Sequence, residues 1–275
     1  MSFAVKWDFA IGETSKILDI PIDTLRYYDK IGLLHPNVQD ENKYRRYTLD
    51  QMDTLVTIKM LRALDISIEE IRVLLSEKKL DNTKDVISKK RGEISDRIRY
   101  YELLNRKIDY LDGVFDKFGD ADYIEIVRSP KYWMILTDSI MESNDKGLSK
   151  KIDRLLKSFS PHKEWITLCH STSIVSEENL QKGEYHSYLN NGIGSTMQLM
   201  GEDNSFEIFP AVICAHKCVI IDDLEYRMID RHYDAMKEFI ARRNYEIAGN
   251  SLEISAFKQY NRHYMEIYIP VKEKV

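Results

Sequence analysis

Two groups of arginine and tyrosine residues near the N-terminus have the chemistry of a DNA contact. The first, Arg26–Tyr28, ends a short predicted helix in "DTLRYYDKIGLLHP", and the second, Lys43–Tyr47, reads "KYRRY". An arginine guanidinium pairs with guanine or phosphate, and a tyrosine hydroxyl favours phosphate oxygens while its ring packs on the protein. The alternative is that one tyrosine is core and the basic side chains form a solvated surface. That alternative suits one tyrosine, but the two groups together favour contact with nucleic acid.

Short helices and a hairpin must position these groups. Apolar residues in "IGETSKIL" define one helix, and Ile22, Leu25 and Ile31 define a second helix that Gly32 ends. Two short helices joined by a tight turn are typical of a helix-turn-helix, whose second helix enters a major groove. The segment "HPNVQDENKYRRY" then predicts an extended hairpin that can act as a wing along the DNA backbone.

Two capping boxes mark the next helices. Thr48 with Gln51, and Ser67 with Glu70, have the spacing at which side chains satisfy the unpaired amides at a helix start. They predict two helices, over about residues 49–64 and 68–76.

A long helix is predicted next, over about residues 82–118, a stretch without proline. Apolar side chains recur every seven residues along it and others fill in beside them: Ile87, Ile94, Ile98, Tyr101, Leu104, Ile108, Leu111, Phe115 and Phe118. This repeat is typical of a coiled-coil seam, on a helix of roughly 50 Å. A single apolar stripe needs a partner helix, and the repeat favours a second copy of the chain over the chain's own C-terminal half.

The residues beyond about 122 alternate strand-like and helix-like stretches. Strands are predicted in "YIEIVRSPKYWMILTDS", "EWITLCHSTSIV", "FEIFPAVICAHKCVIID", "SLEISAF" and "HYMEIYIPV", and helices in "KGLSKKIDRLLKSF" and "YRMIDRHYDAMKEFIARRN". Strands and helices in mixed order indicate an α+β domain. We therefore expect three parts, at residues 1–80, 81–119 and 120–275.

Composition places the chain among ordinary soluble proteins, because 43% of its 275 residues are hydrophobic and 31% are charged. No apolar run approaches the roughly 18 residues of a membrane span, and three cysteines are too few for a disulfide framework. We therefore expect a cytoplasmic protein with no membrane partner. Residues 120–275 hold 19 Lys/Arg against 24 Asp/Glu, which excludes this part as a reader of polyanions.

The motif "CAHKC" needs testing as a metal site. On a strand, Cys214, His216 and Cys218 share one face, but the two cysteines lie about 13 Å apart. Zinc–thiolate bonds are about 2.3 Å long, so both cysteines cannot bind one ion. We therefore expect buried structural cysteines, and neither a metal nor another cofactor.

The N-terminal residues "FAIGETSKILDIPIDTLRYYDKIGLLHP", "YRRYTLDQM" and "LRALDISIEEI", with a long helix next, closely resemble the MerR family of transcription regulators. The resemblance covers residues 8 to about 118 and implies a winged helix-turn-helix and an antiparallel coiled-coil homodimer. It implies DNA contacts at Arg26, Tyr27 and Tyr28 in the recognition helix, Tyr44, Arg45 and Arg46 in the wing, and Arg62 at the backbone. Pro21 departs from the family's usual Ser or Thr cap, so we expect a weaker cap and an intact helix.

The C-terminal part resembles the GyrI-like effector-binding domain of multidrug-sensing MerR regulators, through "FEIFPAVICAHKC", "HYDAMKEFIARRNYEIAGNSLEI" and "YMEIYIPV". The resemblance implies a glutamate in an aromatic-lined pocket, at Glu253, with Glu266 as a second candidate; the alternative for Glu253 is an exposed strand residue. A carboxylate among aromatic rings attracts hydrophobic cations. The rings favoured for this pocket are Tyr268, on the same strand face as Glu266, and then Trp133 and Trp165.

By resemblance, the chain is a ligand-responsive regulator that activates an efflux or multidrug response gene. A homodimer binds pseudo-palindromic, double-stranded promoter DNA, and a hydrophobic, often cationic small molecule lets it distort that DNA so that RNA polymerase reads the promoter. The alternatives are a repressor whose C-terminal domain is purely structural, and an effector domain with hydrolase activity. No nucleophile–base pair or glycine-rich phosphate loop is readable, which argues against an enzyme.

Overall fold

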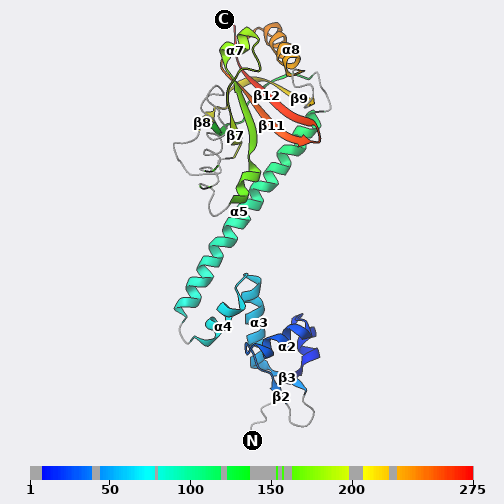
Figure 1. The fold of residues 1–275 in the computed structure, drawn as a ribbon, viewed down its shortest axis with the longest axis vertical. Helices are drawn as coiled ribbons and strands as arrows, with labels where there is room; N and C mark the ends of the chain where they lie inside the picture. The colour runs from blue at the N-terminus through cyan, green and yellow to red at the C-terminus, as the bar shows by residue number, and fades with distance from the viewer. Residues whose placement is uncertain are drawn as a thin grey trace. The chain divides into compact units, whose positions relative to one another are not determined.

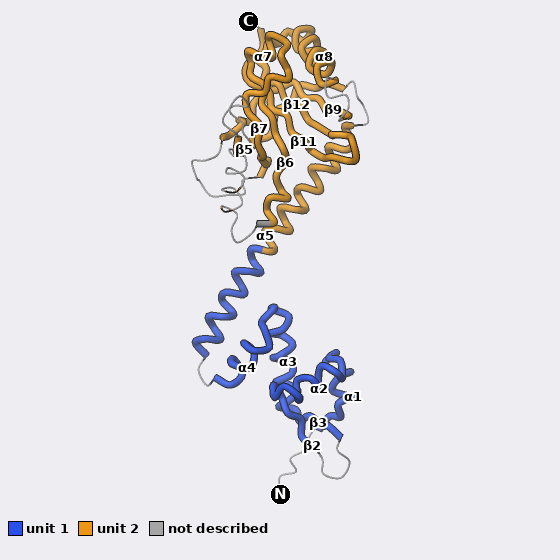
Figure 2. The backbone as a smooth tube through the Cα atoms, in the orientation of Figure 1, with its two compact units in different colours: residues 1–96 blue, residues 97–275 orange. Residues whose placement is uncertain are grey.

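The computed structural model describes residues 8–38, 44–77, 80–118, 123–136, 153, 157, 163–197, 207–222 and 228–274. The chain divides into two compact units, residues 1–96 and 97–275, and each is described by itself (Figure 2). Helix α5 (Asp81–Lys117) begins in the first unit and ends in the second. The division falls within α5, so the expected three-part division stays a prediction. Among the described residues, no helix combines the length and the apolar character needed to span a bilayer.

The first unit combines short helices with a small antiparallel sheet (Figure 1). Its elements in chain order are β1 (Asp8–Ala10), α1 (Ile11–Leu18), α2 (Ile22–Lys30), β2 (Asn37–Val38), β3 (Arg45–Thr48), α3 (Leu49–Ala63) and α4 (Ile68–Ser76). The strand order is β1-β3-β2. Helix α2 forms after Pro21 without a side-chain cap, and Gly32 follows it with a φ of +69°, so both predictions for this helix are confirmed.

Both predicted capping boxes are present and set the starts of α3 and α4. The Gln51 amide donates to the Thr48 hydroxyl at 3.3 Å, and the Thr48 amide donates to the Gln51 side chain at 3.0 Å. The equivalent bonds between Ser67 and Glu70 measure 3.2 and 3.1 Å. The helices enclose a core that includes Ile20, Leu25, Tyr28, Tyr47, Leu55, Ile58, Leu61, Ile66 and Ile71.

The second unit is built on one large sheet, whose described strand pairs are antiparallel (Figure 1). Its strands are β4 (Glu125–Arg128), β5 (Tyr132–Leu136), β6 (His170–Val175), β7 (Tyr188–Ser195), β8 (Glu207–Phe209), β9 (Ile213–Asp222), β10 (Tyr245–Ile247), β11 (Ser251–Gln259) and β12 (Arg262–Glu273). Within the described residues the strand order is β4-β9-β12-β11-β6-β7-β5-β8, and β10 pairs with β12. The helices beside it are η2 (Lys163–Leu168), a 3-10 helix, α7 (Glu177–Lys182) and α8 (Ile229–Arg242). An α+β unit is thus confirmed.

The two faces of this sheet pack against different helices. On one face, Val219 and Ile267 lie in the same apolar cluster as Tyr233 of α8. On the other face, Cys218 packs with Val114 from the last turns of α5. Because side chains alternate between faces along a strand, neighbouring residues of β9, β11 and β12 serve different cores.

Some elements differ from the expectations. Residues 163–168 form a 3-10 helix instead of a strand, and α7, β7 and β10 were not predicted. The strand β7 contains Gly194, where a Cβ atom would lie 2.4 Å from the Tyr132 ring, so only glycine allows this close approach to β5. The predicted helix "KGLSKKIDRLLKSF" lies mostly outside the described residues.

The seven-residue stripe of α5 is divided between two roles. Phe118 and Leu104, expected in the seam, pack inside the second unit. Most other members are exposed on the helix surface: Ile94, Ile98, Tyr101, Ile108 and Phe115. The helix therefore packs on its own C-terminal half by one side, where Phe115 also meets the Phe257 ring edge-on at 5.3 Å, and much of the repeat stays exposed among the described residues.

Candidate functional site

Three side chains of the predicted DNA-binding surface are accessible to a partner. Tyr27 of α2 is 47% exposed, and Tyr44, just before β3, is 69% exposed. Arg26 has a side chain that is 59% exposed and donates to Asp23 on the same helix at 3.0 Å. An exposed ion pair of this kind contributes about 0–1 kcal/mol, so exchange of Asp23 for a phosphate costs little.

Tyr28 has a different position from its neighbour Tyr27. It is only 7% exposed and belongs to the core of the first unit. Burial raises the pKa of its hydroxyl, and the Arg62 charge opposes this rise. The expectation of a DNA contact is therefore corrected for Tyr28. Its side chain packs in the core and holds α2 on the first unit. The alternative interpretation, that one of the two tyrosines is core, applies to Tyr28.

The predicted arginines of the wing and of α3 already have partners within the first unit. Arg46 donates to the Asp8 carbonyl at 3.0 Å and so joins β3 to β1. Arg45 donates to the Asp29 carboxylate at 2.8 Å, and this hydrogen bond lowers the pKa of Asp29 below its ordinary value. Arg62 donates to a backbone carbonyl at 2.7 Å. These contacts orient the arginines, a structural role that the sequence did not indicate, and their contact with DNA stays a prediction.

Glu253 is fully buried on the face of the sheet that packs against α8. The Tyr233 hydroxyl donates to its Oε1 at 2.7 Å, and the Tyr233 ring stacks on Tyr185 with centroids 4.7 Å apart. Among the described residues, its Oε2 has no hydrogen-bond partner. Burial raises the pKa of Glu253 to about 7, against the lowering effect of hydrogen bonds with Tyr233 and Tyr188. The alternative of an exposed strand residue is excluded.

Glu266 is also buried, at 2% exposure, but it is well supplied with hydrogen bonds. Its carboxylate accepts from Tyr110 of α5 and from Tyr268 at 2.8 Å, and it lies 3.0 Å from His216 Nε2. Burial alone would raise the pKa of Glu266, but these hydrogen bonds outweigh it and lower the pKa below its ordinary value. Tyr268 and Glu266 do share one strand face, as the spacing predicted.

The two glutamates lie on opposite faces of the sheet. The strand register pairs Glu266 with Ile254 and pairs Glu253 with Ile267, and residues directly opposite each other point to the same side. The expected ligand residues therefore do not form one site, because Glu266 and Tyr268 face α5 whereas Glu253 faces α8.

The two tryptophans are also placed apart from Glu253. Trp165 lies in η2 and packs with Leu103 and Leu168, in a cluster separate from the one under α8. Trp133 of β5 is partly exposed, with the Lys131 ammonium 5.0 Å from the centre of its ring. This corrects the expectation that these rings line a pocket with Glu253. The ring that lies against Glu253 is Tyr233, on which Tyr185 stacks. The sequence places Tyr233 in the apolar stripe of its helix. Its hydrogen-bond partners Ser251 and Glu253 lie on another element, so no local pattern signals them.

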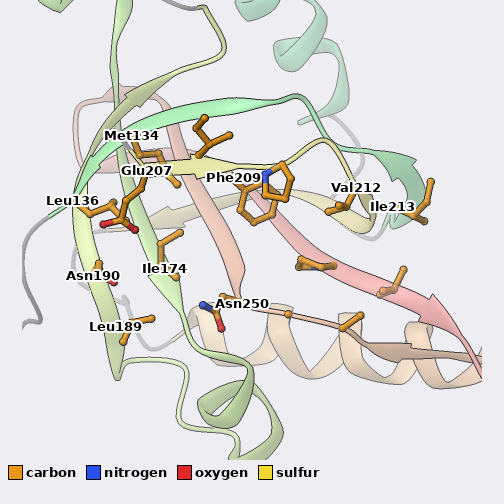
Figure 3. Close-up of a pocket in the computed structure, with 16 residues that line it drawn as sticks. Met134, Leu136, Ile174, Leu189, Asn190, Glu207, Phe209, Val212, Ile213 and Asn250 are labelled. Atoms are coloured by element: carbon orange, nitrogen blue, oxygen red, sulfur yellow. The ribbon is translucent and has the colours of Figure 1, made fainter. Parts of the chain in front are cut away.

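A cavity of about 400 Å³ opens beside β5 and β8 (Figure 3). Its volume suits a small organic molecule. Among the residues that line it, Glu207 alone is charged, and none of the five predicted ligand residues takes part. The lining residues are Met134, Leu136, Ile174, Leu189, Asn190, Glu207, Ile208, Phe209, Pro210, Val212, Ile213, Ala248, Gly249, Asn250, Pro270 and Val271.

Known proteins resemble this chain mainly in its N-terminal part. A family model described as "MerR HTH family regulatory protein" matches residues 9–78. The multidrug-efflux transporter 2 regulator of Bacillus subtilis (strain 168) is 37% identical over 126 residues, which are 46% of this chain and 46% of that protein. The HTH-type transcriptional regulator HmrR of Rhizobium leguminosarum bv. viciae is 33% identical over 106 residues, 37% of this chain and 81% of that protein. A cryo-EM structure of an EcmrR–DNA complex aligns with 97% of this chain and 100% of that chain, at 21% identity and a TM-score of 0.39.

The match to the Bacillus subtilis regulator spans about half the length of that relative, whereas the match to HmrR spans four fifths of it. The shared region includes the helix-turn-helix whose geometry is described above. Both relatives are named as regulators, HmrR as a transcriptional regulator of the helix-turn-helix type. The chain belongs to the MerR family of helix-turn-helix transcription regulators.

Proposed function

We propose that this regulator senses hydrophobic, often cationic small molecules through Glu253 and activates an efflux or multidrug response gene. The observation that carries the proposal is a fully buried carboxylate with one oxygen unpartnered among the described residues. Buried polar atoms are nearly always paired in folded proteins, so an unpaired carboxylate oxygen indicates a partner still to arrive. One relative is a multidrug-efflux transporter regulator, which supports a drug-like molecule as that partner.

The tyrosines next to Glu253 suit a cation with an apolar body. Tyr233 and Tyr185 stack at 4.7 Å, and their rings offer faces that attract positive charge. A ligand cation beside Glu253 favours the ionised carboxylate, which burial otherwise opposes. Binding of such a cation therefore stabilises the ionised form of Glu253, which burial disfavours when no ligand is bound. It also requires the stacked rings of Tyr185 and Tyr233 to move apart.

The exposed stripe on α5 supports a homodimer. Five apolar side chains at coiled-coil spacing would bury their surface against a second copy: Ile94, Ile98, Tyr101, Ile108 and Phe115. In the proposed mechanism the antiparallel dimer binds a pseudo-palindromic promoter, and ligand binding favours a state that distorts the DNA so that RNA polymerase reads both promoter elements. Such a distortion costs on the order of several kcal/mol, which differential contacts in two protein states can supply.

The dimer is tested by placing charge in the stripe. The double change Ile94→Asp and Ile108→Asp puts unpaired carboxylates into the seam and should give monomers, because burying them costs several kcal/mol each. Sedimentation or light scattering measures the mass. Ser95→Asp adds a charge at an exposed residue that shares no heptad position with the stripe, and it serves as the control. A stable dimer in the double variant would place the interface elsewhere.

Ligand sensing is tested with two probes of one shape, phenyltrimethylammonium and its neutral counterpart tert-butylbenzene. Glu253→Gln keeps the side-chain shape and removes the charge, so affinity for the cation should fall by about 1–3 kcal/mol while the neutral probe changes little. Isothermal titration against both proteins measures the difference. DNA binding without ligand should be unchanged in this variant.

The cavity beside Phe209 is the competing location, so Glu207→Gln is the matched variant. A loss of cation affinity in Glu207→Gln alone would move the ligand into that cavity. Equal losses for both probes in Glu253→Gln would mean that Glu253 supports the fold and not the ligand. In vitro transcription with and without the cation then separates an activator from a repressor whose C-terminal unit is purely structural.

A further inference from the structure

We propose that His216, Cys218 and Glu266 form a binding site for a divalent transition-metal ion, with Zn²⁺ as the best match. The three residues lie on the face of the sheet that packs against α5, away from Glu253. They offer one imidazole nitrogen, one thiol and one carboxylate, and these ligand atoms all lie within 4.8 Å of one another. Nitrogen, sulfur and oxygen together are a donor set typical of zinc.

The strands bring the three ligands together. His216 and Cys218 are two residues apart on β9, so their side chains point to the same face. Glu266 lies directly opposite Cys218 on the neighbouring strand β12. A rigid sheet thus supplies the positions, and each residue is at most 5% exposed. Sites on strands are held more precisely than sites on loops.

The distances are close to those of a metal site. His216 Nε2 lies 3.0 Å from Glu266 Oε1 and 3.8 Å from Cys218 Sγ. In a tetrahedral zinc site, the bond lengths to nitrogen, oxygen and sulfur place the ligand atoms about 3.4–3.6 Å apart. Small side-chain movements therefore suffice for these two pairs. Three protein ligands leave a fourth position, which a water molecule can take.

Residues outside the three ligands hold the His216 imidazole in place. His216 Nδ1 lies 3.0 Å from Glu125 Oε1, and the Lys117 ammonium donates to the same carboxylate at 2.8 Å. A carboxylate behind a histidine is the usual outer partner of a zinc ligand, because it fixes the tautomer that leaves Nε2 open to the metal. The side chains of Glu125 and Lys117 are 21% and 44% exposed, so they connect the site to solvent and give a path of entry.

The alternative is a purely structural network in which His216 donates to both carboxylates. In that case the Cys218 thiol contributes only packing. Metal binding instead displaces the proton on His216 Nε2 and the proton of the thiol, and a metal–sulfur bond forms. The two possibilities therefore differ in whether Cys218 becomes a ligand, and that difference is directly measurable.

The test is a Co²⁺ titration of the full-length, reduced chain, followed by absorption spectroscopy. A cobalt–thiolate bond gives a charge-transfer band in the near ultraviolet, and we expect this band to saturate at one Co²⁺ per chain. Cys218→Ser should abolish it. Glu125→Gln should keep the band but weaken binding by about 10- to 100-fold, the usual effect of an outer partner. Cys214→Ser is the matched control, since Cys214 is buried on the same strand, and it should change neither band nor affinity.

Absence of the band at saturating Co²⁺, its survival in Cys218→Ser, or its loss in Cys214→Ser would each overturn the proposal. Circular dichroism reports whether the variants fold. If Cys218→Ser fails to fold, zinc-edge X-ray absorption on the unmodified chain decides the question: one sulfur neighbour supports the site, and neighbours of nitrogen and oxygen alone overturn it.

Discussion

Glu253 and Glu266 are both buried glutamates on adjacent strands, yet their environments have opposite effects on charge. Glu253 faces α8, receives the Tyr233 hydroxyl, and has a pKa raised to about 7 by burial. Glu266 faces α5, accepts hydrogen bonds from Tyr110 and Tyr268, lies against His216, and has a lowered pKa. Burial is nearly equal, at 0% and 2% exposure, so the contact with His216, which only Glu266 has, accounts for most of the difference in pKa.

The two buried glutamates therefore have different roles, one structural and the other proposed to be in ligand binding. Glu266 is ionised because the fold supplies its partners, so its charge holds α5 against the sheet. Glu253 has a raised pKa because burial opposes its charge and only tyrosine hydroxyls offset that effect, so a ligand cation can supply the missing stabilisation.

Replacing Glu266 should destabilise the second unit most. Glu266→Leu leaves three buried donors without an acceptor, and breaking a buried charged network of this kind costs about 3–5 kcal/mol. Glu253→Leu should cost about 1 kcal/mol, because Tyr233 keeps a partner in the Ser251 hydroxyl at 3.1 Å. Urea unfolding at pH 7, followed by tryptophan fluorescence, measures both. Equal costs would remove the contrast.

The raised pKa of Glu253 should make the protein less stable as the pH rises. The unfolded chain releases this proton near the ordinary pKa of 4.5, whereas the folded chain holds it to about 7. Between these values the unfolded state binds fewer protons, so the free energy of unfolding should fall by about 3 kcal/mol as pH rises through this window. The lowered pKa of Glu266 acts in the other direction, with stability lost as pH falls below 4.5.

The measurement is urea unfolding at a series of pH values, for the unmodified chain and for Glu253→Gln. The difference between the two curves isolates Glu253, since every other titrating group is shared. A flat difference between pH 4.5 and 7 would show that Glu253 is not held neutral in the folded chain.

Removing one tyrosine hydroxyl from each face should give the smallest effects. Tyr268→Phe takes a donor from an ionised carboxylate and should cost about 2 kcal/mol, whereas Tyr233→Phe should cost about 1 kcal/mol. The Tyr233 hydrogen bond lowers the pKa of Glu253, so Tyr233→Phe should also extend the pH window upwards. The same unfolding series tests this. A larger loss for Tyr233→Phe than for Tyr268→Phe would reverse the assignment of charge to the two faces.

Local sequence signals predicted the first unit well. The Thr48 and Ser67 capping boxes fix the starts of α3 and α4 through short-range hydrogen bonds, and Gly32 ends α2 through its backbone conformation. Such signals depend on residues within a few positions of each other, so they are readable without the fold. The Tyr268–Glu266 pairing was readable for the same reason, because the two residues are neighbours on one strand face.

The ligand candidates could not be grouped correctly, because their grouping depends on strand register. An odd or even offset between β11 and β12 decides whether Glu253 and Glu266 share a face, and no local residue pattern determines that offset. The strand β7 escaped prediction for a related reason. Its glycines and asparagines disfavour strands locally, and only the close approach of β5 makes Gly194 necessary.

The continuity of α5 has a consequence for recombination between regulators. Its early residues Val86 and Ile87 pack on the first unit, and its late residues Val114 and Phe118 pack on the second, with no loop between them. Each residue inserted into a helix adds about 100° of rotation and 1.5 Å of length. A fusion that exchanges the C-terminal unit must therefore conserve helical phase as well as length. Crossovers within this helix should be tolerated mainly when they add or remove whole heptads.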